Sequence, residues 1–323
     1  MTEAKAKQLL DRDLMDTFVA EKLSPTITLL RELVDYGADL IHRAAQRHEN
    51  SRGDLIIIGH FLKHAITMLD GVEIQLSRGA VSQATVSARS MLETYIYLSW
   101  LLKEDTERRT RQFYVWHQRQ QRVWVRRMIP GTTEHAEFAK CRAAVPKMTE
   151  GAQAELHEND ARRQDAVIGK FLSDPQNRAF NDAFEKIKRK NSDVHWYQPG
   201  GPNSVRDMAK RLNLDVEYDV FYSQFSDVSH ATAFDKNVKF RNGTIILEQI
   251  RNPEGFRTVV NHVSTLALEI FRSIIARYFP QDMEAYNLTY VTKWRERFFS
   301  VPEVVIKRPT DDKKESPVST MTP

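Results

Sequence analysis

The sequence predicts an all-α fold, a multi-helix bundle with one small β-hairpin near residues 237–250. Only 12 Gly and 12 Pro occur in 323 residues, and apolar residues recur at spacings of three and four over long stretches. The hairpin is indicated by Asn242-Gly243, which suits a tight turn and stands between β-prone residues. The 41% hydrophobic content is enough for a chain of this length to bury a substantial core.

The helices of the first half are bounded by start and stop signals in the sequence. Pro25 favours a fresh start, because proline suits the first helical position. Asp54 is expected to cap the helix that follows it, and the sequence SRGA is expected to end that helix. The connection to the next helix is short, so these two helices are expected to form an antiparallel hairpin. The predicted helices span residues 5–20, 24–49, 55–77, 80–102 and 105–128.

The second half has weaker helical signals before a clear apolar pattern returns. Pro130-Gly131 ends the preceding long helix, and the stretch after it is highly charged. Ser204 is placed to cap the sequence VRDMAKRL. Residues 133–172 are expected to hold two or three helices, and further helices are predicted over 178–190, 205–212, 215–232 and 255–279.

Composition predicts four regions along the chain. The last residues, KRPTDDKKESPVSTMTP, are polar and contain proline, so they are expected to be disordered. A charged stretch in the middle offers few large apolar residues to a core, which is typical of an insertion. The predicted regions are N-terminal helices over 1–49, a main helical domain over 50–280 with a charged insertion around 130–190, a C-terminal helical segment over 281–304 and a disordered tail over 305–323.

Charge and cysteine content exclude several classes of protein. The formal net charge is only +4, so any charge that binds nucleic acid must be local. Cys141 is the single cysteine, which excludes an internal disulfide framework and zinc fingers and favours a reduced compartment. The first residues lack the apolar run of a signal peptide, and no apolar run approaches the roughly 18 to 20 residues of a membrane span. The protein is therefore expected to be soluble and cytoplasmic, without a membrane partner.

Two predicted helices carry polar side chains at the rims of their apolar faces. In the helix over 80–102, Arg89 and Glu93 lie one turn apart on one rim. In the sequence YSQFSDVSH, three polar residues recur every four positions and would form one ridge on a helix: Tyr222, Ser226 and His230. Two such rims that face each other would make a shared polar pocket.

The apolar face of the later of these helices is centred on Phe225. At 100° per residue, Tyr218, Phe221 and Val228 fall close to Phe225. These three residues are therefore expected to face the core.

His230, Arg89 and Glu93 are the candidate catalytic residues of this pocket. A histidine titrates near neutral pH and can transfer protons, and Arg89 offers a planar fork of donors that suits phosphate. Glu93 could orient either one, and Tyr222 and Ser226 are candidate substrate-binding residues. The simpler alternative is that Arg89 and Glu93 form a partly buried ion pair, while His230 bonds a backbone carbonyl.

Arg111 and His117 are a second pair of candidate substrate-binding residues. They lie in the segment ERRTRQFYVWHQRQQRVWVRR, which combines phosphate-binding charge with two tryptophans that could stack on bases. A solvated helix face with its tryptophans docked inward is the favoured interpretation, and a nucleic-acid track is the alternative.

No metal and no cofactor are predicted. His60 and His64 are one helical turn apart, but Phe61 stands where a metalloprotease motif has its glutamate. No cluster of acidic residues near them supplies further ligands. The chain also has no glycine-rich phosphate loop of the P-loop or dinucleotide type.

The sequence SRGAVSQATVSARSMLETYIYLSWLLK, then a tryptophan loop and SVRDMAKRLNLDVEYDVFYSQFSDVSH, resembles a bacterial family catalogued as domain of unknown function 5677. The similarity covers roughly residues 50–280, and its specific parts are Arg89-Ser90, Glu93, Tyr222, Ser226 and His230. The resemblance implies an all-helical domain with kinship to small helical ribonuclease-toxin and nucleotide-binding domains of the HEPN type. Those domains carry an Arg four to six residues before a His. No Arg stands there before His230, whereas Arg111 and His117 have that spacing.

Two functions remain open from the sequence. The first is a HEPN-like, metal-independent endoribonuclease, a toxin or antiviral effector, because RNA supplies its own 2′-hydroxyl nucleophile and a His with an Arg would suffice. The second is a non-catalytic helical module that binds a nucleotide, a nucleic acid or a partner protein. RNA or a nucleotide is the expected ligand, and a homodimer is compatible with both functions.

Overall fold

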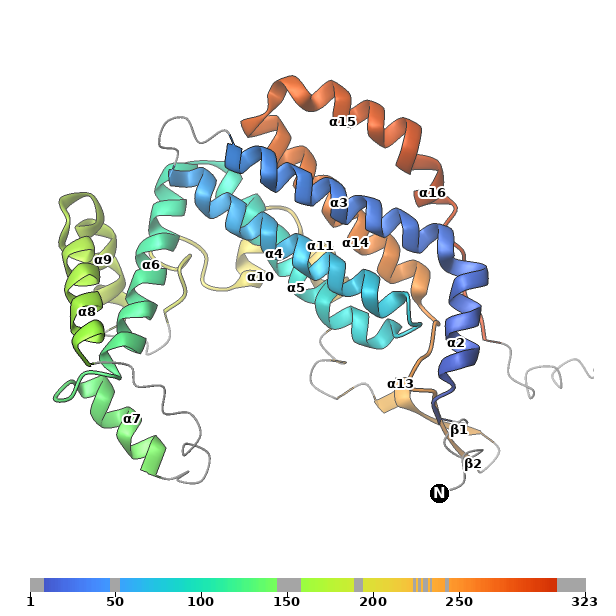
Figure 1. Ribbon diagram of the computed structural model, residues 1–323, viewed down its shortest axis with the longest axis horizontal. Coiled ribbons are helices and arrows are strands. Elements are labelled where there is room, and N and C mark those ends of the chain that lie inside the picture. The colour runs from blue at the N-terminus through green and yellow to red at the C-terminus, as the bar shows by residue number, and fades with distance from the viewer. Residues whose placement is uncertain are drawn as a thin grey trace, which may run out of the picture. The chain divides into compact units, whose positions relative to one another are not determined.

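The computed structural model describes a chain that is almost wholly helical (Figure 1). The described residues are 9–46, 53–143, 158–188, 194–222, 225, 228, 232, 234–241 and 244–306. Within these ranges the only sheet is a two-stranded antiparallel hairpin. The predicted fold class is therefore confirmed.

The chain forms two compact units, each built from segments that are separated in sequence. Unit 1 comprises Met1–Gln46, Phe61–Tyr95 and Asp215–Pro323. Unit 2 comprises Arg47–His60 and Ile96–Leu214. The four predicted regions follow sequence position and remain a prediction; each unit is described by itself below.

The N-terminal helices of unit 1 run into one another without the predicted interruption near Ser24-Pro25. Asp11 caps the first of them, because its Oδ1 accepts the Leu14 N–H at 3.0 Å. A π-helical turn then replaces the expected break, and Pro25 lies in the first turn of the next helix, as predicted. The elements are α2 (Arg12–Phe18), η1 (Val19–Leu23) and α3 (Ser24–Gln46).

Two long helices, α4 (Gly53–Leu76) and α5 (Val81–Lys103), form the predicted hairpin and lie side by side in Figure 1. Asp54 does not precede α4 as a cap but lies inside its first turn. The connection turns at Gly79, whose φ of 68° is readily adopted only by glycine. Because a helix places residues one turn apart on the same side, the hairpin positions the side chains of the candidate site.

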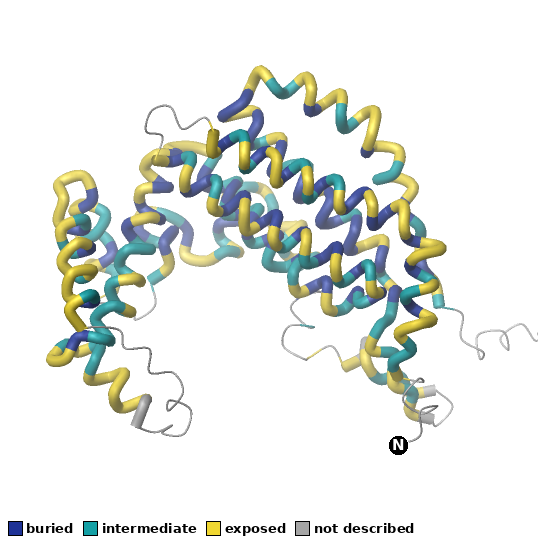
Figure 2. The backbone as a smooth tube through the Cα atoms, in the orientation of Figure 1, coloured by how far each residue is buried: buried dark blue, intermediate teal, exposed yellow. Residues whose placement is uncertain are grey.

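The core of unit 1 is built around α14 (Phe256–Tyr278), the most deeply buried helix of the unit. Figure 2 shows its buried residues beside those of α3. Gly37 on α3 allows the close approach, because a Cβ there would lie 2.1 Å from Ile66 Cδ1 and 3.0 Å from Phe271 Cε1. The C-terminal segment is helical, with α15 (Met283–Thr289), η5 (Tyr290–Trp294) and α16 (Arg295–Phe299).

Two described helices, α4 and α14, are long and apolar enough to cross a membrane by length and composition. Their mean hydropathies are 1.4 and 1.3 over the most apolar windows, of which 44% and 61% are buried. Core helices of soluble proteins pass the same test, so the pattern is weak evidence for a membrane span.

Unit 2 is a group of helices around a small apolar cluster of Val115, Ile168, Leu172 and Phe184. Ser204 caps α10 as predicted, because its Oγ accepts the Asp207 N–H at 3.1 Å. The helix predicted to start at residue 178 begins at Pro175. The elements are α6 (Thr106–Arg126), α7 (Thr133–Ala143), α8 (Glu158–Ser173), α9 (Pro175–Lys188) and α10 (Val205–Arg211).

The segment predicted as one helix over 215–232 changes its helical type after one turn. It starts as α11 (Asp215–Glu217), continues as the π-helical turn η3 (Tyr218–Tyr222), and Phe225 and Val228 are again α-helical. The short α13 (Phe234–Asn237) leads into the hairpin of β1 (Val238–Arg241) and β2 (Thr244–Leu247). Its register pairs Val238 with Leu247 and Arg241 with Thr244, while the predicted turn residues Asn242 and Gly243 lie outside the described residues.

Candidate functional site

Arg89 on α5 contacts Tyr222 on η3, so two segments 133 residues apart meet in unit 1. The guanidinium Nη2 donates to the Tyr222 hydroxyl at 2.5 Å. The Arg89 Cζ also lies 4.2 Å from the centroid of the Tyr222 ring, within the range of a cation–π contact. The structure therefore brings together two of the residues that the sequence nominated for one pocket.

Glu93 lies one turn from Arg89 on the same helix and completes the expected polar rim. Its Oε1 lies 3.5 Å from Arg89 Nε, and the two side chains are 30% and 17% exposed. A pair of this exposure contributes little to stability, because solvent screens it. The two charged side chains remain partly accessible to solvent.

Tyr218 joins this cluster, although the sequence placed it on the apolar face beside Phe225. Its ring stacks on the Tyr222 ring with centroids 4.3 Å apart and planes 14° apart. The π-helical turn explains the difference, because its wider winding invalidates a rotation of 100° per residue. Burial, with smaller contributions from Tyr222 and Glu93, raises the pKa of Tyr218 well above its usual range. Its hydroxyl therefore stays protonated.

His64 on α4 is a residue that the sequence reasoning considered only as a metal ligand. Its Nε2 lies 3.1 Å from the Oγ of Ser90, the residue next to Arg89. The adjacency of Ser90 and Arg89 was visible in the sequence, but the register of the two helices was not. The cluster thus includes an imidazole within hydrogen-bonding distance of a hydroxyl. We name Arg89, Ser90, Glu93, His64, Tyr218 and Tyr222 the α5 cluster.

A cavity of about 370 Å³ in unit 1 begins one helical turn along α5 from Arg89. Thr85 lines it, together with Phe225 and Val228 from the segment that follows η3 and with Lys239 from β1. Thr85 and Arg89 are four residues apart and so lie on the same side of α5. The cavity thus starts one turn from Arg89, and the residues that line it do not include members of the α5 cluster.

Ser226 and His230 lie outside the described residues. Their neighbours Phe225 and Phe221 pack instead against His262 on α14, with ring centroids 5.4 and 3.9 Å apart. His262 is 6% exposed, its Nε2 bonds no described residue, and burial lowers its pKa to about 4. His262 is therefore neutral near pH 7, and its ring packs against Phe221 and Phe225. These two phenylalanines were expected to face the core.

Arg111 and His117 belong to unit 2, and Arg111 borders a separate cavity of about 660 Å³ there. Arg111 lines that cavity and its Nη1 donates to Gln176 Oε1 at 2.6 Å. Tyr114 also lines the cavity, and its ring stacks on that of His117 with centroids 6.4 Å apart. Tyr114 thus links the cavity that Arg111 lines to the ring of His117.

Several other arginines of α6 pair with carboxylates of unit 2 and are not free for phosphate. Arg119 lies 2.6 Å from Glu185, Arg122 lies 2.7 Å from Asp165, and Arg126 lies 3.2 Å from Glu134. Trp116 is docked, because its Nε1 donates to the Val194 carbonyl at 2.8 Å. Trp124 is 60% exposed, with the Arg127 Cζ 4.0 Å from its ring centroid. Most of these side chains of α6 are therefore engaged in contacts within unit 2.

His60 and His64 have different neighbours. The His60 ring lies 6.0 Å from that of Phe113 within unit 2, whereas His64 contacts Ser90. Across the part of the chain that the structure describes, no group of three or more His, Cys, Asp or Glu residues could hold a metal ion.

Comparison with known proteins identifies the family of this chain. The profile of a family of unknown function, DUF5677, matches residues 55–245, and the chain belongs to that family. No curated protein and no solved structure matches it. The matched range includes α5 and η3, so the α5 cluster lies wholly within it.

Proposed function

We propose that the protein is a metal-independent endoribonuclease whose active site is the α5 cluster together with His230. The contact between Arg89 and Tyr222 carries this proposal. It places a fork of phosphate-binding donors at a partly exposed position, where a tyrosine hydroxyl and a carboxylate hold it.

The chemistry requires two proton transfers and stabilisation of one charged phosphorane. A base removes the proton of the RNA 2′-hydroxyl, and that oxygen attacks the adjacent phosphorus. The bond from phosphorus to the 5′-oxygen breaks, and an acid donates a proton to the leaving oxygen. The products are a 2′,3′-cyclic phosphate and a free 5′-hydroxyl. His230 and His64 are the proposed acid–base groups, and Arg89 is the proposed partner of the phosphorane charge.

The proposed setting is that of a cytoplasmic toxin or antiviral effector that acts on RNA. Kinship with helical ribonucleases of the HEPN type is part of this proposal, and so is a homodimer. Arg111 and His117 have the spacing of those enzymes, and Arg111 lines the cavity of about 660 Å³ in unit 2. It makes unit 2 a second place at which RNA could bind.

The sharpest test is the chemistry of cleavage by the full-length protein. A single-stranded RNA should be cut to fragments that end in 2′,3′-cyclic phosphate. The same oligonucleotide with 2′-deoxy sugars should resist cleavage, because it lacks the nucleophile. EDTA should leave the rate unchanged, since His and Arg side chains supply the catalysis. Cleavage of the deoxy substrate, or loss of activity in EDTA, would contradict the proposal.

Substitutions in the α5 cluster should separate catalysis from folding. Arg89→Lys retains the charge but loses the planar fork, so the cleavage rate should fall about 100-fold or more. His230→Gln and His64→Gln should each lower the cleavage rate about 100-fold or more, because glutamine cannot transfer the proton. Arg272→Lys is a matched control, because Arg272 is exposed on α14 and forms an ion pair with Glu269, outside the α5 cluster. Expression of the wild type or of Arg272→Lys in bacteria should arrest growth, whereas expression of the Arg89, His230 or His64 variants should not.

A non-catalytic binding module is the second candidate, and the satisfied donors of Arg89 favour it. Two of its guanidinium nitrogens already face Tyr222 and Glu93. A network of this kind could serve as a rigid stacking platform for a nucleotide. The module is supported if RNA binds, Arg89→Lys weakens that binding, and no cleavage occurs under any condition.

A further inference from the structure

The β-hairpin of unit 1 presents an apolar face to solvent. Its register pairs Val238 with Leu247 and Phe240 with Ile245, and paired residues of a hairpin point to the same face of the sheet. Phe240, Ile245 and Leu247 are 68%, 63% and 59% exposed. Phe234 on α13 is 55% exposed and extends this face, because its ring stacks on that of Phe240 with centroids 6.2 Å apart. We name these five residues the hairpin face.

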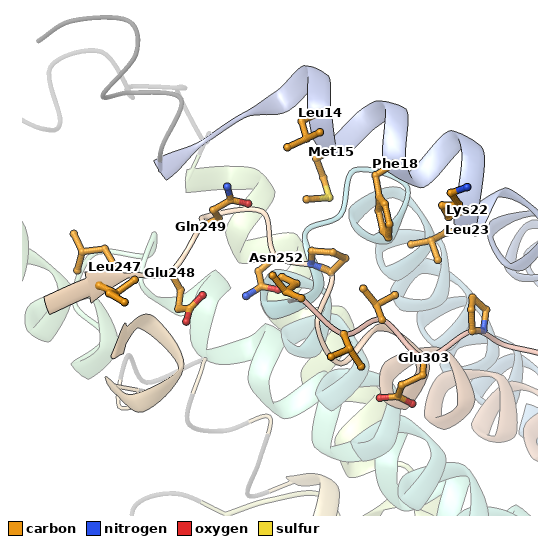
Figure 3. Close-up of a pocket in the computed structure, with 16 residues that line it drawn as sticks. Leu14, Met15, Phe18, Lys22, Leu23, Leu247, Glu248, Gln249, Asn252 and Glu303 are labelled. Carbon is orange, nitrogen blue, oxygen red and sulfur yellow. The ribbon is translucent and has the colours of Figure 1, made fainter. Parts of the chain in front are cut away.

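The opposite face of the hairpin, which carries the pair Lys239 and Ile246, lies toward the rest of unit 1. Lys239 lines the cavity of about 370 Å³, and Ile246 lines a larger cavity of about 880 Å³, which Figure 3 shows and which Leu247 also borders. A sheet with one solvated face normally directs apolar side chains inward and charged ones outward. Here a lysine lies on the inner face and a phenylalanine on the outer one. This inversion is expected of a face that another chain covers.

The strand edges also favour contact with another chain. Within the described residues the sheet holds two strands of four residues each, so each strand has one edge that no other strand covers. A two-stranded hairpin is marginally stable by itself, and an uncovered edge can pair with a further strand. A second chain would therefore stabilise the hairpin at its face and at its edges.

The chain's own ends are poorly suited to cover the hairpin face. The sequences MTEAKAKQ before Leu9 and KRPTDDKKESPVSTMTP after Ile306 contain no aromatic residue and few large apolar ones. RNA is disfavoured as the occupant as well, because all five residues of the face are apolar and offer no cation to a phosphate.

A second copy of the chain fits the hairpin face in chemistry and in area. Because the face carries no charge, two identical faces can meet across a two-fold axis without like-charge repulsion. From their exposed fractions, its side chains present roughly 500 Å² of apolar surface, since a large apolar side chain has roughly 150 to 200 Å² to expose. A standard interface buries about 800 Å² on each partner, of which about 65% is apolar in homodimers, or about 500 Å².

We propose that the hairpin face is the interface of a homodimer, in which the hairpins of two copies pack against each other about a two-fold axis. Phe240 and Ile245 of each copy lie at the centre of this interface, and Phe234 and Leu247 flank them. The inference rests on the homodimer that is part of the proposed function and names the surface that forms it.

Sedimentation equilibrium of the full-length protein without RNA tests the proposal. The wild type should be a dimer at about 100 µM and should dissociate on dilution. Phe240→Lys and Ile245→Lys each place two ammonium groups in the interface, so each should weaken dimerisation at least about tenfold. Leu288→Lys is the matched control, because Leu288 on α15 is also 63% exposed but lies outside the hairpin. It should dimerise as the wild type does.

A milder variant and a measurement on the wild type separate loss of contact from loss of the hairpin. Ile245→Thr keeps a residue that favours strands and should still weaken dimerisation severalfold. Hydrogen exchange of the wild type should show added protection of β1 and β2 at concentrations at which it dimerises.

Three results would each overturn the proposal. They are a wild type that stays monomeric at about 100 µM, dimerisation that Phe240→Lys and Ile245→Lys leave unchanged, and equal weakening by Leu288→Lys. The first would leave the hairpin face to a different protein, and the other two would place the dimer interface elsewhere. None of them decides whether the protein cleaves RNA, because the mass is measured without RNA and the cleavage products are identified separately.

Discussion

Arg89 shows how one side chain can join two distant segments. Its guanidinium donates a hydrogen bond to the Tyr222 hydroxyl and makes a cation–π contact with the Tyr222 ring. Its contact with Glu93 is longer, at 3.5 Å. The contact with Glu93 follows from their separation by four residues on one helix, whereas the contact with Tyr222 does not. The chemistry of the α5 cluster therefore depends on a long-range contact.

Removal of the Tyr222 hydroxyl should test the strength of this contact. Tyr222→Phe keeps the ring but loses the bond to a charged group, which should lower the free energy of unfolding by about 1 kcal/mol. Tyr290→Phe is the control, because the Tyr290 hydroxyl bonds none of the described residues. Urea denaturation of both variants provides the measurement. Equal stability of Tyr222→Phe and the wild type would mean that the bond is not formed in solution.

His262 should make the stability of the protein depend on pH. Burial lowers its pKa from 6.5 to about 4, so between these values the unfolded chain binds a proton that the folded chain does not. Stability should therefore decrease as the pH falls from 6.5 to 4, by up to about 3 kcal/mol from this group. Denaturation midpoints across this range, compared with those of His262→Phe, measure the effect. An unchanged pH dependence in the variant would exclude His262 as its source.

At the scale of elements, the π-helical turn η3 has the largest effect on the site. Its winding stacks Tyr218 on Tyr222 and leaves Phe221 and Phe225 against His262. A regular α-helix would have placed Tyr218 with the phenylalanines, as the apolar pattern suggested. π-helical turns are common at functional sites, which agrees with the proposed role of this segment.

Two helical glycines should respond in opposite ways to the same substitution. Gly37→Ala would place a Cβ 2.1 Å from the buried Ile66, so it should lower stability by about 1 kcal/mol or more. Gly59→Ala on α4 meets nothing within 4 Å and should raise stability by about 0.5 to 1 kcal/mol, because alanine favours helix. The thermal unfolding temperatures of the two variants compare the cost of a steric clash at residue 37 with the gain in helix propensity at residue 59. A gain for both would show that α3 and its neighbours tolerate a wider separation.

At the scale of the whole molecule, burial ends close to the last described residues. Val301 and Val304 are 3% and 8% exposed, whereas Val305 is 72% exposed. The polar sequence after Ile306 offers little to a core. The boundary of the folded chain should therefore lie near residue 305.

Two truncations, one on each side of residue 305, should show where the folded chain ends. Deletion of residues 307–323 should leave the melting temperature within about 1 °C, because few apolar groups are lost. Deletion of residues 300–323 removes two buried valines and should lower stability by about 3 kcal/mol or more. Differential scanning calorimetry measures both. A lower melting temperature for the shorter deletion would show that the tail contributes to the fold.

The sequence by itself determined the helical class, most helix boundaries and the hairpin. Ser204 caps α10 and Gly79 turns the α4–α5 hairpin as expected, because caps and turns depend on residues within a few positions of each other. The same locality placed Arg89 and Glu93 on one rim.

Only the tertiary structure decided which rims meet. It paired Arg89 with Tyr222 and His64 with Ser90, moved Tyr218 into the cluster, and grouped Arg111 with Gln176 in the other unit. These contacts depend on how helices far apart in sequence pack, and on one turn with irregular winding. Apolar periodicity reports which face of a helix is buried but not its partner, so no local pattern could have supplied them.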